Sequence, residues 1–148
     1  MAFHFSLESV LTVRKNIEEQ MQLKLAREQM MLHNHQARLV DLQDKRHELS
    51  EAIEERKKKP MLGRMFLFYM EAMRIQELQL RILQTTIASQ KNIVEKVRAD
   101  LAQAMKQRKI IDVLREKELE KYLLEMRRRE QKESDEQALL RHGRGIRL

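Results

Sequence analysis

Apolar residues recur along the first third of the chain in steps that alternate between three and four. Such spacing places them on one face of an α-helix and is typical of a coiled-coil seam. The seam positions are Leu7, Val10, Ile17, Met21, Leu25, Leu32, Leu39, Leu42, Leu49 and Ile53. Arg14, Glu28, His35 and Arg46 interrupt this seam. The pattern predicts a first helix over about residues 6–58, with Ser6 as a candidate N-cap.

The same stepping continues in the second half of the chain. Its seam positions are Tyr69, Met73, Leu80, Leu83, Ile87, Val94, Val97, Leu101, Ala104 and Ile111. Gln76, Gln90 and Arg108 fall on this seam, and after Ile111 the phase drifts to Leu114, Leu119, Leu123 and Met126. No Gly or Pro lies between residues 64 and 142. We therefore predict a longer second helix over about residues 65–142, followed by a frayed tail over 143–148 that contains Gly143 and Gly145.

The segment between the two seams holds the only Pro, Pro60, and the first Gly, Gly63. Proline disfavours helix at the residue before it, and glycine allows the positive φ of a tight reversal. We predict a turn over residues 59–64 and an all-α fold, a long two-helix antiparallel coiled-coil hairpin that forms a single domain across residues 1–148. Reversal here pairs Ile53 with Met70. A single uninterrupted rod that dimerises is the alternative, and the turn residues argue against it.

The pairing predicted for this hairpin leaves the end of the second helix without an intramolecular partner beyond about residue 120. That overhang carries Tyr122, Leu123, Leu124 and Met126, followed by the basic residues Arg127, Arg128 and Arg129. An exposed apolar stripe beside a basic cluster indicates a binding surface.

Composition narrows the class of protein further. The chain has 148 residues with 3 Gly, 1 Pro and no Cys, and 36% of its residues are charged. This is the composition of long helices, and it excludes disulfides and thiolate metal sites. No signal peptide is visible, and the apolar run from Met65 to Met70 is too short to span a bilayer, so we expect a cytoplasmic protein. The net charge is +7, but both signs are interspersed, as on a solvated coiled-coil surface.

No motif for catalysis or cofactor binding is present in the sequence. Three glycines cannot build a phosphate-binding loop, and no nucleophile elbow occurs. His33 and His35 point in different directions on a helix, and His47 with Glu51 gives two metal ligands without a third. We predict that the chain is not an enzyme and holds no cofactor or metal.

The run from Met65 to Met70 has more large apolar residues than a two-stranded seam can bury. One interpretation is that Phe66 and Phe68 cap the end of the hairpin. The other is a binding patch near the bend, with Phe66, Tyr69 and Met73 along one face, because aromatic residues and Met are favoured in protein interfaces. A nucleic-acid binder is a further alternative for the basic residues, although aromatic residues for base stacking are scarce near them. A membrane-surface helix is disfavoured by the mixed polar face.

The first residues resemble a known family. The segment Phe3-His4-Phe5-Ser6-Leu7-Glu8-Ser9-Val10-Leu11-Thr12-Val13-Arg14 is similar to the start of FliJ proteins of the bacterial flagellar export apparatus. Those proteins typically open with two phenylalanines around one residue, then Leu-Glu-x-Val-Leu and a basic residue. The length, central turn and Cys-free helical composition also match, but only residues 3 to 14 are specific.

This resemblance implies a stalk-like coiled coil without enzyme activity. It would bind the ring of the export ATPase hexamer, promote its assembly and activity, and link it to the cytoplasmic ring of the export gate. Export chaperones are further implied partners, and association with the membrane apparatus would be peripheral, through proteins. The ATPase end would comprise Phe3, Phe5, Leu7, Tyr122, Met126, Arg127, Arg128 and Arg129, and the gate-facing bend Phe66, Tyr69 and Met73. The alternative is a generic cytoplasmic coiled-coil chaperone or scaffold.

Overall fold

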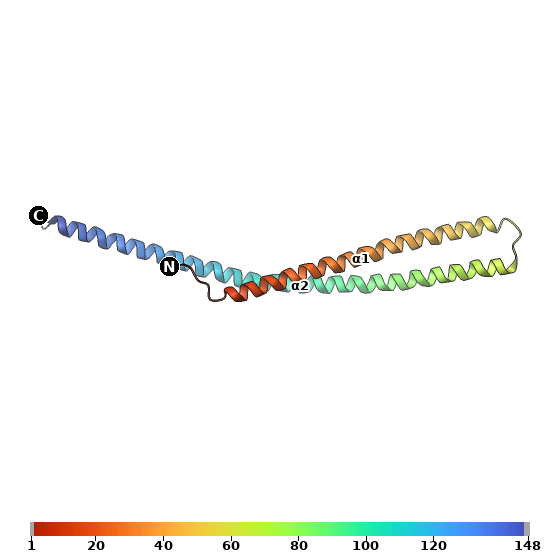
Figure 1. The fold of residues 1–148 in the computed structure, drawn as a ribbon, viewed down its shortest axis with the longest axis horizontal. Helices are drawn as coiled ribbons and strands as arrows, with labels where there is room; N and C mark the ends of the chain where they lie inside the picture. The colour runs from red at the N-terminus through yellow and green to blue at the C-terminus, as the bar shows by residue number, and fades with distance from the viewer. Residues whose placement is uncertain (1, 147–148) are drawn as a thin grey trace. The chain divides into compact units, whose positions relative to one another are not determined.

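The computed structural model describes residues 2–146, and the side-chain surroundings of residues 2–143. It contains two α-helices, α1 (Glu8–Arg56) and α2 (Gly63–Ile146), joined by a short connection (Figure 1). The described residues form no β-strand. The two helices pack against each other and the second is the longer, so the predicted two-helix coiled-coil hairpin is confirmed.

Contacts within the chain divide it into two units, which we describe separately. The first unit comprises the chain up to Glu19 together with the chain from Gln103 onward, and the second unit is Gln20–Ala102. Each unit contains a segment of α1 paired with a segment of α2.

The second unit has its core along the predicted seam. Its buried apolar residues all occupy predicted seam positions: Ile53, Leu80, Leu83, Ile87, Val94 and Val97. Some of the polar residues that interrupt the seam have partners across it, whereas the buried Oε1 atom of Gln76 has no hydrogen-bond partner among the described residues. The Gln90 side-chain amide donates to the Glu28 carboxylate at 2.6 Å and to the Glu28 carbonyl oxygen at 3.0 Å. Arg46 and Glu77 form an ion pair at 2.9 Å.

These pairs also fix the direction and register of the two helices. Glu28 contacts Gln90, whereas Arg46, later in α1, contacts Glu77, earlier in α2, so the segments run antiparallel. Ile53 lies seven residues after Arg46 in α1, and Met70 lies seven residues before Glu77 in α2. These two residues are the pair expected from the position of the turn.

The first unit has a small core built around Phe5, Leu11 and Ile111, with Phe3 and Leu7 packed against it. Here the predicted seam is wrong by one position on α1. Leu11 is 2% exposed, whereas Val10 and Ile17, the predicted seam residues, are 36% and 42% exposed. The seam of α1 runs through Leu11 and then through Glu18, seven residues later, because the Glu18 side chain points towards α2 and contacts an arginine there.

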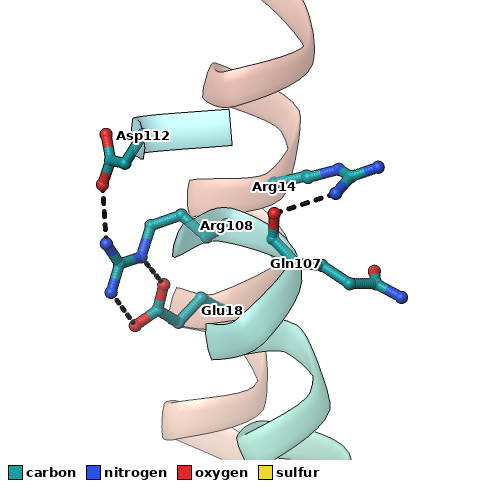
Figure 2. A network of polar contacts seen from close by, with 5 residues as sticks. All are labelled: Arg14, Glu18, Gln107, Arg108 and Asp112. Carbon is teal, nitrogen blue, oxygen red and sulfur yellow. Dashed lines mark hydrogen bonds and ion pairs between the residues drawn. The ribbon is translucent and has the colours of Figure 1, made fainter. Parts of the chain in front are cut away.

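That arginine, Arg108, is the centre of a polar network in the first unit (Figure 2). Its guanidinium donates to both carboxylate oxygens of Glu18, which is buried, and to Asp112 on its own helix at 2.7 Å. Arg14 donates to the carbonyl oxygen of Gln107 at 2.8 Å. Hydrogen bonds from Arg108 to Glu18 first, and to Asp112, raise the pKa of Arg108 above its ordinary value. The buried carboxylate therefore always faces a positive charge.

The connection differs from the predicted turn over residues 59–64. α1 ends at Arg56 rather than near residue 58, because the amides of Lys58 and Lys59 donate to carbonyls three residues earlier, at 3.4 and 3.2 Å. α2 begins at Gly63, and no described residue has a positive φ. The reversal therefore lies before Gly63, whose predicted role in a left-handed turn is wrong.

The other end of α2 also differs from the prediction. The helix continues to Ile146, through the glycines that were expected to end it and to start a frayed tail over 143–148. Glycine inside a helix costs only about 1 kcal/mol relative to alanine, so two glycines do not by themselves terminate a helix. Residues 147–148 lie outside the described residues.

We expect Gly63→Ala to stabilise the protein. A Cβ atom at Gly63 would meet no atom within 4 Å, and the backbone has no positive φ there. The substitution reduces the freedom of the unfolded chain and should raise the free energy of unfolding by about 0.4–1 kcal/mol. Urea unfolding followed by circular dichroism measures this, and a loss of stability would contradict the observed start of α2.

We expect Arg108→Ala to lower the melting temperature by about 3–8 °C, because it leaves the buried Glu18 carboxylate without its cation. Adding Glu18→Ala to that variant should cost little more, since the unpaired charge is then removed. Melting curves of the two single variants and the double variant test this. Additive losses would show that the two side chains are not energetically coupled.

Candidate partner-binding surfaces

The N-terminal segment, residues 2–7, packs along α2 in the first unit. The rings of Phe3 and Tyr122 lie 5.5 Å apart between centroids at an interplanar angle of 53°. The guanidinium carbon of Arg115 lies 5.9 Å from the centre of the Phe3 ring, and Arg115 also forms an ion pair with Glu8 at 3.0 Å. The structure therefore joins two of the predicted site residues, Phe3 and Tyr122, into one cluster.

This contact corrects the expectation that α2 lacks an intramolecular partner beyond about residue 120. Residues 2–5 are not helical, and a non-helical segment covers more length per residue than the 1.5 Å of a helix. The few residues before α1 therefore reach Tyr122. The sequence contained the signal, since Phe3 and Phe5 precede the first helical residue, but their partner could not be read from periodicity.

The predicted ATPase-end residues differ in how much surface they present. Phe5 is 3% exposed, so its side chain belongs to the core and is not itself a surface anchor. Four of the residues are half-buried: Phe3, Leu7, Tyr122 and Met126. The three arginines that follow, Arg127, Arg128 and Arg129, are exposed, and none forms an ion pair with a described residue. They form a solvated basic group beyond the aromatic contact.

At the connection, the structure separates the predicted bend residues in a similar way. Phe66 is 45% exposed, whereas Tyr69 and Met73 are half-buried. Phe68 is 71% exposed, so it does not cap the end of the hairpin as one interpretation of the sequence required. The surplus apolar residues of this segment face solvent.

The exposed apolar surface near the connection continues along α2, which was not predicted from the sequence. Phe68, Ile75, Leu78 and Ile82 follow one another at steps of seven, three and four, and they are between 43% and 71% exposed. This spacing puts them on one helix face, which we call the outer stripe. Beside it the Arg74 guanidinium donates to both carboxylate oxygens of Glu71, at 2.6 and 3.0 Å, and this hydrogen bonding lowers the pKa of Glu71. The apolar spacing of the outer stripe is present in the sequence, next to the spacing that predicted the buried seam of α2.

Neither a metal centre nor a membrane segment is found in the part of the chain that the structure describes. His47 and Glu51 contact each other at 2.9 Å, but no cluster of three or more metal-ligating side chains is formed by the described residues. No helix within residues 2–146 has an apolar stretch of the length that crossing a membrane requires.

The fold and these surfaces define a class of protein, a two-helix coiled coil with exposed apolar and basic residues on its long helix. Within that class the comparison with protein families is specific. A model described as flagellar FliJ protein matches residues 3–147, nearly the whole chain, and the chain belongs to the FliJ family of flagellar export components. No curated protein and no solved structure matches the chain.

Proposed function

We propose that this chain is a stalk-like, non-enzymatic component of the flagellar export apparatus that binds the ring of the export ATPase. The basic group Arg127, Arg128 and Arg129 next to the Phe3–Tyr122 contact is the observation that carries this proposal. The arginines are exposed and have no acidic partner among the described residues, so they are available to carboxylates of another protein. In this interpretation Phe5 acts indirectly, because its burial holds Phe3 against Tyr122.

The aromatic contact and the basic group lie close together, because Phe3 of the N-terminal segment meets Tyr122 of α2 and the arginines follow Tyr122 along the same helix. Phe3, Tyr122 and Met126 supply partly exposed apolar surface, and the arginines supply charge immediately beyond it. Aromatic residues and Arg are the types that contribute most to protein interfaces. Binding here would promote assembly and activity of the ATPase, with the protein held peripherally at the membrane apparatus through its partners.

The bend is proposed to contact the cytoplasmic ring of the export gate. The support is the exposure of Phe66, Leu67 and Phe68, at 45%, 68% and 71%, on a chain whose core does not use them. Tyr69 and Met73 contribute only the parts of their side chains that the seam leaves uncovered. The outer stripe extends the same apolar surface and suits export chaperones, which this proposal includes as transient partners.

Replacing Arg127, Arg128 and Arg129 together by Glu should raise the concentration needed for half-maximal stimulation of the export ATPase at least about tenfold, because like charges would then meet the acidic partner surface. ATP hydrolysis is measured against the concentration of this chain. The matched control replaces Lys57, Lys58 and Lys59 by Glu, which makes the same change in net charge in another exposed run. Equal stimulation by both triple variants and the unchanged protein would reject the assignment of the arginines.

Replacing Leu67 and Phe68 together by Ser should weaken binding to the purified cytoplasmic domain of the export gate by about tenfold or more, because each side chain is over two-thirds exposed and supplies apolar area. ATPase stimulation should not change. Leu23→Ser with Val40→Ser is the control, since these residues are 60% and 56% exposed on α1. If the control weakens gate binding as much as the bend variant, the bend is not the contact.

A further inference from the structure

In the first unit, α2 has a second apolar face that the core does not use. Ile110, Val113 and Leu114 are 58%, 38% and 40% exposed, and Leu124 is 48% exposed. A shallow groove of about 570 Å³ runs between Lys106 and Lys117 over the first three of these residues. A second groove of about 390 Å³ continues it from Leu114 to Leu124. We call this surface the lysine-edged strip.

The strip lies on the side of α2 opposite the core. The residues that face α1 and the N-terminal segment are Ala104, Arg108, Ile111, Arg115 and Tyr122, and the strip residues fall between them in the sequence. At 100° per residue, Ile110 and Lys117 point away from Ile111. The sequence predicted that the seam drifts to Leu114 and Leu123. That prediction is wrong, because the seam continues through Arg115 and Tyr122. Leu114 belongs to the outward face.

The edges of the strip are basic. Lys106, Lys109 and Lys117 line the first groove, which no acidic residue lines, and Lys121 lies along the second. None of these four lysines forms an ion pair with a described residue. The acidic residues Glu118 and Glu120 line only the second groove. Asp112 and Glu116 line a neighbouring groove on the other side of Lys109 and Val113. The first groove is thus bordered by three lysines that form no ion pair with a described residue, and acidic residues lie only beyond it.

We propose that the lysine-edged strip binds an acidic amphipathic helix of a partner protein. Ile110, Val113, Lys117 and Leu124 repeat at steps of three, four and seven, the spacing with which one helix receives the side chains of another. From Lys106 to Leu124 the strip is about 27 Å long, which matches about five turns of helix. The aliphatic stems of the lysines extend the apolar surface, while their ammonium groups face the carboxylates of the partner.

A second copy of this chain fits the strip poorly when the two copies run parallel, because each lysine would then face the same lysine of the other copy. Like charges across a helix pair are unfavourable. An antiparallel second copy would place Glu118 and Glu120 near the lysines of the first groove, and sedimentation of the chain alone tests that arrangement. The proposal concerns a different face from the one assigned to the ATPase and does not depend on Arg127, Arg128 or Arg129.

The test uses a synthetic 21-residue helical peptide with Leu at the a and d positions of each heptad and Glu at the e and g positions, labelled with fluorescein. Its glutamates suppress self-association. Titration with the full chain, followed by fluorescence anisotropy, should show saturable binding. A matched peptide with Lys in place of Glu should bind at least about tenfold more weakly. Failure of the acidic peptide to saturate at 200 µM, a concentration of order 10⁻⁴ M, overturns the proposal.

Variants locate the binding face. Lys109→Glu with Lys117→Glu should weaken binding of the acidic peptide at least about tenfold, and Ile110→Ser with Leu114→Ser should do the same without changing the helical circular dichroism. The control is Lys91→Glu with Lys96→Glu, two exposed lysines of the same helix, which should leave the affinity within about twofold. Equal losses in strip and control variants would mean nonspecific charge attraction and overturn the proposal.

Two further measurements exclude other occupants. Analytical ultracentrifugation of the chain alone should show no dimer that Ile110→Ser with Leu114→Ser disperses. Vesicles containing phosphatidylserine should not bind the chain through the strip. A strip-dependent dimer, or strip-dependent vesicle binding without peptide binding, would assign this face to a second copy or to a lipid surface and overturn the proposal. Loss of ATPase stimulation in the triple arginine variant with peptide binding retained would separate this site from the proposed ATPase contact.

Discussion

Two helices that pair along a single seam have no second layer to hide a misplaced polar group. Polar side chains on the seam are therefore favourable only where they find a partner across it or remain partly solvated. The buried Oε1 atom of Gln76, which has no hydrogen-bond partner among the described residues, is an exception. Arg108 and Glu18 show this constraint in the first unit, and Gln90 and Glu28 show it in the second. Because each pair forms at one alignment of the helices, the polar positions that weaken the core also specify how the helices align.

A thin core leaves much of each helix surface free, and α2 uses this freedom. It carries more apolar residues than the seam can bury, in the outer stripe near the connection and in the lysine-edged strip of the first unit. Exposed apolar stripes of this size are unfavourable for a solitary protein, since they promote association. One long helix can thus present separate faces for the separate contacts that we propose.

The helices, their order and the seam of the second unit could be predicted because periodicity and the lone proline report them directly. The register of the seam at the start of α1 could not. Val10 and Leu11 are adjacent and both apolar, and Glu18 reads as a solvent-facing residue until Arg108 is known to lie opposite. Among the predicted site residues, the arginines were correctly expected to be exposed, but the burial of Phe5 was not. Phe5 is covered through a tertiary contact of the non-helical residues before α1. Helical periodicity carries no information about the contacts of non-helical residues.

The distance along the chain between contacting residues has a consequence for synthesis. Glu28 and Gln90 are separated by 62 residues, and Glu8 and Arg115 by 107. Contacts that close longer loops cost more entropy, so we expect pairing to start near the connection and to proceed towards the termini. A growing chain is made from its N-terminus, and Phe3 meets Tyr122 only after most of α2 has left the ribosome. The aromatic residues that are translated first are thus the last to be covered.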